Sequence, residues 1–284
     1  MRSADLGGRP AGETAQPAAA PASGPTAKRP TIRPLVTFAG LVISLEAVVF
    51  LLPLGRDLTP FALVLIPAAG GLIVSARSGG GAAVRTLLCR LRVWRVRPRW
   101  YAAAILIPVG EKIIVDATGI ALGRTTPQLL LSALGIAALT LPLVVLIPGL
   151  LEELGWRGFA VQTAVDGGRS PAWATLVVGG LFFLFHVPLY LPGHIYHGLP
   201  FWPLPLTLLA SAVFLTWIYL RTGSVLLAGL MHAAFNATTP LTGGLDPTWV
   251  WQARAVILSV LAIALIASGQ LRKSAYAGVK SHTN

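Results

Sequence analysis

Apolar segments long enough to cross a membrane recur along most of this chain. A membrane-spanning helix needs roughly 20 consecutive apolar residues. Eight such segments are predicted, near residues 35–54, 58–76, 101–122, 129–154, 171–191, 203–221, 224–241 and 249–269. Because lipid offers no hydrogen bonds to the backbone, these segments must satisfy their own amides and carbonyls as helices. We therefore expect an all-α fold, a polytopic membrane helix bundle of about eight transmembrane helices.

The composition agrees with a membrane protein. Hydrophobic residues make up 55% of the 284 positions and charged residues 11%, whereas a soluble globular domain has about 25% charged residues. The net charge of +12 would also suit a nucleic-acid-binding protein. The basic residues, however, lie between apolar segments, so we expect membrane lipid and no nucleic acid as a partner. The single cysteine, Cys89, excludes an internal disulfide.

The basic residues also predict a topology. If eight spans leave both termini on one side, that side holds 18 of the 22 Lys and Arg residues, Arg157 among them. The other side holds Arg56, Arg124 and Arg254, and Lys112 lies within a span. The positive-inside rule then makes the chain a multi-pass protein of the cell membrane with cytoplasmic N- and C-termini. Its high Ala, Gly, Arg and Pro content indicates a bacterial source. The loop 77–99 holds seven arginines and is either a basic amphipathic helix on the inner leaflet or only a topology determinant.

Three regions are predicted along the chain. Residues 1–30 are rich in Ala, Pro, Gly and Ser without an apolar run, so we expect a disordered N-terminal tail and no cleaved signal peptide. Residues 31–272 form the expected integral membrane domain, and residues 273–284 a flexible C-terminal tail.

Two adjacent carboxylates, Glu152 and Glu153, lie inside the apolar run 148–158 with Arg157. Charges are costly within a bilayer and usually mark a functional site there. On a helix Glu153 and Arg157 are one turn apart and can form an ion pair. Glu152 points about 100° away and lacks that partner. We therefore expect Glu152 to carry out proton chemistry while Glu153 and Arg157 organise the site; the alternative is a structural Glu–Arg contact between helices.

Two later apolar segments each carry a histidine. Phe182 and His186 lie one turn apart, as do His232 and Asn236. His232 and Asn236 can both donate hydrogen bonds to an oxyanion. Each motif alone also fits a hydrogen-bonded core histidine or a polar contact between helices.

Taken in order, Glu-Glu-x-x-x-Arg, Phe-x-x-x-His and His-x-x-x-Asn resemble the CPBP family, which comprises CAAX proteases and bacteriocin-processing enzymes and includes type II CAAX prenyl endopeptidases and abortive-infection proteins. The resemblance covers roughly residues 129–241. It implies a glutamic intramembrane endopeptidase that cleaves a membrane-associated peptide or protein. Glu152 would activate water with help from His186, and His232 and Asn236 would form the oxyanion hole.

Several alternatives remain open. Two histidines and a carboxylate can hold catalytic zinc, but the chain has no His-Glu-x-x-His motif, so a metal-free site without a cofactor is favoured. The chain could also be a non-catalytic relative that gives bacteriocin immunity or binds a membrane partner, or a proton-relaying transporter. The remaining polar residues within or near spans are expected to be structural: Glu46, Glu111, Lys112, Asp116, His194 and His197.

Overall fold

The computed structural model describes residues 32–124, 146–238 and 246–272, and within these ranges it contains helices and no strands. The α-helices are α1 (Arg33–Leu51), α2 (Gly55–Cys89), α3 (Pro98–Ala121), α5 (Ile147–Glu153), α6 (Gln162–Asp166), α7 (Pro171–Leu184), α8 (Pro203–Thr222), α9 (Val225–Thr238) and α10 (Pro247–Ala267). A π-helix, η3 (Leu154–Val161), joins α5 to α6, and short 3₁₀ turns are η1 (Arg90–Arg92), η4 (Val187–Tyr190) and η5 (Gln270–Arg272). The predicted all-α membrane helix bundle is confirmed.

Five of the described helices are long and apolar enough to cross a membrane. They are Arg33–Leu51, Leu58–Arg92, Pro171–Tyr190, Pro203–Thr222 and Pro247–Ala267. The predicted segments 101–122 and 224–241 correspond to α3 and to the shorter apolar helix α9. Most of the predicted segment 129–154, like the two predicted tails, lies outside the described residues.

Local sequence signals explain where several helices begin and end. The side chain of Ser170 accepts a hydrogen bond of 3.1 Å from the amide of Trp173 at the start of α7. Asp246 does the same for Trp249 at the start of α10, at 3.0 Å. Such caps satisfy amides that have no partner within the helix. Helix α8 ends at Gly223, which has a φ of 68° and so occupies the left-handed conformation that favours glycine.

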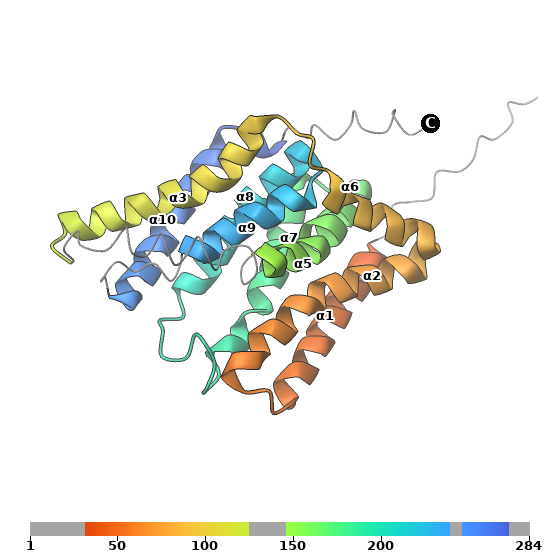
Figure 1. The fold of residues 1–284 in the computed structure, drawn as a ribbon, viewed down its shortest axis with the longest axis horizontal. Coiled ribbons are helices and arrows are strands. Elements are labelled where there is room, and N and C mark those ends of the chain that lie inside the picture. The colour runs from red at the N-terminus through yellow and green to blue at the C-terminus, as the bar shows by residue number, and fades with distance from the viewer. Residues whose placement is uncertain (1–31, 125–145, 239–245, 273–284) are drawn as a thin grey trace, which may run out of the picture.

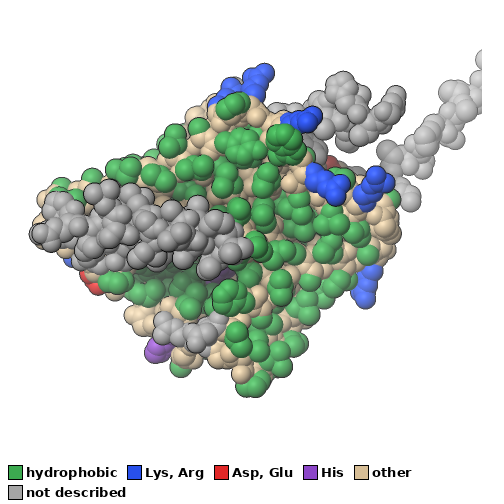
Figure 2. All heavy atoms as spheres, in the orientation of Figure 1, with side chains coloured by type: hydrophobic (Ala, Val, Ile, Leu, Met, Phe, Trp, Pro, Cys, Tyr) green, Lys and Arg blue, Asp and Glu red, His purple; other side chains and the backbone are tan. Residues whose placement is uncertain are grey.

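The helices that carry the candidate residues lie at the centre of the bundle (Figure 1). Helix α5 packs against α9, α9 against α3 and α8, and α8 against α7 and α10. Helices α1 and α2 form a pair on one side, with α2 covering α5 and η3. Apolar side chains also cover much of the outer surface, as Figure 2 shows for one face, and outward-facing examples are Leu106, Leu176 and Ile263. An apolar exterior of this kind suits contact with lipid.

Three features differ from the sequence prediction. The helix expected to end at residue 154 continues through η3 and α6 to Asp166. Arg157, counted on the cytoplasmic side, is instead fully buried within the bundle. Arg254, counted on the opposite side, is also buried, in α10. Both arginines therefore act inside the protein rather than as topology signals.

Candidate active site

A close contact between α5 and α9 brings the first and third motifs together. A Cβ atom at Gly149 would lie 2.8 Å from the carbonyl oxygen of Gly229, and one at Gly229 would lie 2.6 Å from the side chain of Leu150. The two glycines therefore allow the backbones to approach more closely than larger residues would permit. Glu152 and Glu153 follow Gly149 by about one turn, and His232 follows Gly229 by about one turn. The close approach thus places the carboxylates beside the imidazole.

Glu153 lies at the centre of a buried hydrogen-bond network. Its Oε1 accepts a hydrogen bond of 2.8 Å from Nη1 of Arg157, so the predicted ion pair is present. The same oxygen lies 2.8 Å from Nδ1 of His232, which donates to it. Glu153 and Arg157 are both 0% exposed. A charged group so deeply buried is stabilised only by partners of opposite charge and hydrogen bonds, and Glu153 therefore links η3 to α9.

Arg157 belongs to the π-helix η3, whose turns are wider than those of an α-helix. The amide of Gln162 donates to the carbonyl of Arg157, five residues earlier. Gly155 allows η3 to pack against α2, since a Cβ atom there would come within 2.2 Å of the carbonyl oxygen of Pro67. Single π-helical turns in proteins frequently occur at functional sites.

The aromatic ring of Phe182 connects the second motif to this network. The centroid of the ring lies 5.5 Å from the guanidinium carbon of Arg157. The ring packs edge to face against the rings of His186 and His232, with centroid distances of 4.6 and 6.0 Å. His186 itself follows the end of α7, and its Nδ1 donates to the carbonyl of Phe182 at 2.8 Å. In the neutral imidazole this bond places the proton on Nδ1, which leaves Nε2 as an acceptor.

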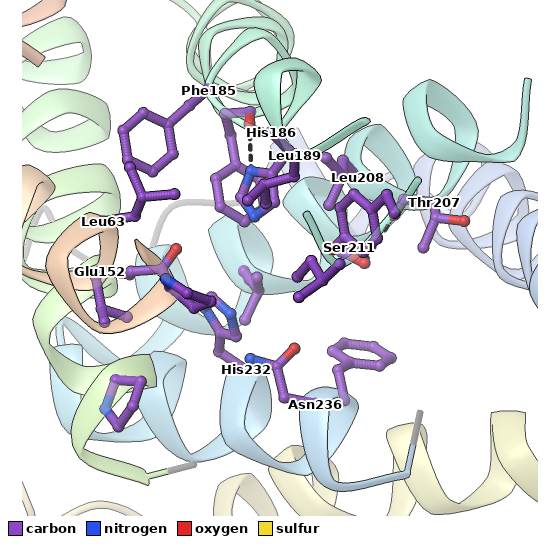
Figure 3. A pocket seen from close by; sticks show the side chains of 18 of the residues that line it. Leu63, Glu152, Phe185, His186, Leu189, Thr207, Leu208, Ser211, His232 and Asn236 are labelled. Carbon is purple, nitrogen blue, oxygen red and sulfur yellow. Dashed lines mark hydrogen bonds between the residues drawn. The ribbon is translucent and has the colours of Figure 1, made fainter. Parts of the chain in front are cut away.

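One cavity collects all four predicted catalytic residues. Glu152, His186, His232 and Asn236 line a space of about 610 Å³, and Figure 3 shows their side chains around it. Glu153 and Arg157 do not line this cavity. Glu152 is 8% exposed, and its Oε2 accepts no hydrogen bond from the described residues. The two adjacent carboxylates therefore occupy different surroundings, one open to the cavity and one enclosed behind it.

Other cavity-lining residues were not singled out from the sequence. Tyr196, Trp251 and Arg254 line the wall contributed by α10 and the loop 191–202. Burial raises the pKa of the Tyr196 phenol, which keeps it neutral and able to donate a hydrogen bond. Nε of Arg254 lies 3.8 Å from Oε1 of Glu111. Arg254 is a charged residue within the apolar segment 249–269, which could have predicted a role at the site. The sequence prediction assigned it to the external side of the membrane instead.

Apolar side chains form much of the rest of the cavity wall. Phe61 and Leu63 come from α2, Leu189 from η4, and Leu208 and Leu215 from α8.

Within the described ranges, no three His, Cys, Asp or Glu side chains gather closely enough to hold a metal ion.

The polar residues expected to be structural do not line the cavity. Contacts with neighbouring side chains are evident for Lys112, Asp116 and His194. The predicted contact between Lys112 and Asp116 is present as a hydrogen-bonded ion pair. The ring of His194 is half-buried and packs against Phe50, with centroids 4.9 Å apart. Glu46 is buried in α1.

A comparison with protein families matches the part of the chain that carries the three motifs. Residues 134–238 match the family described as type II CAAX prenyl endopeptidase Rce1-like. This segment includes Glu152, His186, His232 and Asn236. No curated protein matches the chain. Over the segment 134–238, the chain is therefore similar to CAAX-type endopeptidases of this family.

Proposed function

We propose that this protein is an intramembrane endopeptidase that hydrolyses a peptide bond with water activated by Glu152. One observation carries the proposal. Glu152 opens onto a cavity that it shares with His186, His232 and Asn236, while Glu153 is held behind the cavity by Arg157 and His232. A carboxylate that faces a cavity beside two imidazoles and a carboxamide is suited to general-base catalysis.

In the first step, Glu152 accepts a proton from a water molecule whose oxygen attacks the carbonyl carbon of the substrate peptide bond. His186 assists by accepting a hydrogen bond from the same water at Nε2, because its Nδ1 already donates to the carbonyl of Phe182. The attack converts the carbonyl oxygen into an oxyanion.

The oxyanion accepts hydrogen bonds from His232 and Asn236. Because Nδ1 of His232 donates to Glu153, this role requires the imidazolium form, which keeps a second donor at Nε2. The carboxylate of Glu153 stabilises that cation. Donors of this kind contribute about 3–4 kcal/mol each to transition-state stabilisation in known hydrolases. Glu152 then returns its proton to the peptide nitrogen as the C–N bond breaks, which yields a carboxylic acid and an amine; the acid ionises on release.

The substrate class follows from the cavity wall. Phe61, Leu63, Leu189 and Leu208 would surround apolar side chains, and an apolar exterior suits a substrate that reaches the site from the membrane. We therefore infer a membrane-associated peptide or protein as the substrate. The mechanism needs no metal or other cofactor, since Glu152 supplies the proton acceptor.

The proposed setting is a bacterial cell membrane, with multiple spans and both termini in the cytoplasm. Its support is the distribution of Lys and Arg along the chain. In Figure 2 most of the visible Lys and Arg side chains lie along the upper and right-hand edges of the molecule.

The direct test uses purified protein in liposomes with fluorogenic, membrane-associated peptides, and mass spectrometry of the products. We expect internal cleavage that leaves a new carboxylate and a new amine. Comparing the membrane and secreted peptidomes of wild-type and deletion cells would supply the natural substrate for the same assay. Ion flux across the liposomes without hydrolysis of that substrate would refute the enzyme and support a transporter. Binding of the substrate without either activity would support a non-catalytic relative.

A further inference from the structure

An exposed basic segment, residues 81–99, takes no part in the proposed chemistry. It comprises the last turns of α2, η1, the connection to α3 and the first two residues of α3. We call it the arginine segment; it contains Arg85, Arg90, Arg92, Arg95, Arg97 and Arg99. All of these except Arg90 are exposed, and none forms an ion pair with a described Asp or Glu. The sequence between Asp57 and Glu111 contains no acidic residue, so this positive charge is not balanced locally.

A reversal in α2 holds the segment against the bundle. The helix breaks at Gly79 and Gly80, and Gly80 has a φ of 61°, a conformation that side chains other than glycine rarely adopt. Figure 1 shows the ribbon turning back at this point, between its orange and gold parts. Leu87 is 2% exposed and packs against Gly71 of α2 and Gly158 of η3. One face of the returning helix is therefore fixed to the protein.

The segment contacts η3, which carries Arg157, and the residue that precedes α9, which carries His232 and Asn236. Arg90 donates a hydrogen bond to the carbonyl of Gly158, the residue after Arg157 in η3. The hydroxyl of Ser224 donates to the carbonyl of Val93 at 2.6 Å and accepts from the amide of Leu227 at 3.1 Å. Ser224 directly precedes α9, the helix of His232 and Asn236. Anything that stabilises the segment thus also stabilises the ends of η3 and α9.

The opposite face combines cationic and apolar groups. Arg85 and Arg92 are two helical turns apart, roughly 10 Å along the axis, and they flank a surface cavity of about 360 Å³ that Leu88 also lines. Leu88 is 41% and Trp94 57% exposed, and the guanidinium carbon of Arg95 lies 4.9 Å from the centroid of the Trp94 ring. Arginines beside exposed leucine and tryptophan are typical of a helix at the boundary between headgroups and acyl chains.

We propose that the arginine segment binds anionic phospholipids of the membrane in which the bundle lies. Arg85 and Arg92 hold the headgroup phosphate through charge-assisted hydrogen bonds. Leu88 and Trp94 enter the boundary of the acyl chains. Because a ligand that binds only the folded state raises its stability, anionic lipid makes the segment, and with it η3 and α9, harder to unfold.

The experiment compares protein reconstituted in phosphatidylcholine alone and in phosphatidylcholine mixed with phosphatidylglycerol. The readouts are the unfolding temperature and the phosphatidylglycerol retained in native mass spectrometry, neither of which depends on proteolysis. We expect a higher unfolding temperature with phosphatidylglycerol. The double variant Arg85→Gln/Arg92→Gln should bind this lipid on the order of tenfold more weakly and lose most of the temperature shift.

The matched control is Arg124→Gln/Arg169→Gln, which removes two exposed arginines outside the segment and should keep the shift. A second measurement needs no variant, because high salt should reduce the shift in the wild-type protein. An equal shift in both double variants, or none in the wild-type protein, would overturn the proposal. A shift of the same size with inorganic phosphate in phosphatidylcholine would overturn the assignment to a lipid.

Discussion

Removal of Arg157 should destabilise the protein by an amount that its surroundings allow us to anticipate. The guanidinium is 0% exposed, pairs with Glu153 at 2.8 Å and lies against the ring of Phe182. Arg157→Ala leaves Glu153 buried with His232 as its only described hydrogen-bond partner. Breaking one side of a buried ion pair costs about 3–5 kcal/mol. For a chain of this size the melting temperature should fall on the order of 10 °C.

A double-mutant cycle separates the pair from a simple loss of packing. In Arg157→Ala/Glu153→Gln, the second change removes the buried carboxylate that the first change leaves without its ion-pair partner. We expect the two variants to be non-additive, with the double variant more stable than the sum of the single effects by about 0.5–3 kcal/mol. Activity should remain low, because His232 has lost the carboxylate that stabilises its imidazolium.

Thermal unfolding in detergent, followed by intrinsic tryptophan fluorescence, measures these effects. Arg169→Ala is the control, since Arg169 is an exposed arginine with a cation–π contact to Trp173 and should change the melting temperature little. A stable Arg157→Ala protein, or strictly additive single effects, would refute the view that the buried pair holds the site together.

Three further predictions concern the cavity. His232→Ala and Asn236→Ala should each lower kcat strongly while the Kd of an uncleaved substrate stays nearly unchanged, because an oxyanion contact forms only in the transition state; a lower melting temperature with normal kcat would instead indicate a contact between helices. Gly149→Ala should reduce both stability and activity, since its Cβ would lie 2.8 Å from the carbonyl oxygen of Gly229 and force α5 away from α9. Gly180→Ala is the control, because the added Cβ meets nothing within 4 Å. Equal effects of the two changes on stability and activity would contradict this packing. Dialysis against chelators should leave hydrolysis unchanged; sensitivity reversed by stoichiometric zinc would show that a metal activates the water.

Much of the helix placement was predictable because each spanning segment must be both apolar and internally hydrogen-bonded. The segments predicted at 35–54, 171–191, 203–221 and 249–269 correspond closely to α1, to α7 with η4, to α8 and to α10. The reversal at Gly80 was only partly predictable. The basic composition of 77–99 suggested an amphipathic helix, but its return onto the bundle depends on tertiary contacts of Leu87 and Arg90.

The contacts within the candidate site, like the fold, were predictable only in part from the sequence. Helical spacing was enough to predict the contact between Glu153 and Arg157, and the charge rule identified Glu152 as unusual. Spacing could not predict the hydrogen bond from His232 to Glu153, because those residues are 79 positions apart. The π-helix η3 has no signal in the hydrophobic pattern, because it depends on how η3 packs around Gly155 and Pro67.

The most direct test of the central claim is the hydrolysis rate of Glu152→Gln. This change keeps the size of the side chain and removes the proton acceptor, so kcat should fall by roughly 10² or more while the melting temperature and substrate Kd stay near the wild-type values. Glu46→Gln is the matched control, since Glu46 is also a buried glutamate in an apolar helix but does not line the cavity; it should keep normal activity. A Glu152→Gln protein that retains most of its activity would contradict the assignment of Glu152 as the catalytic base.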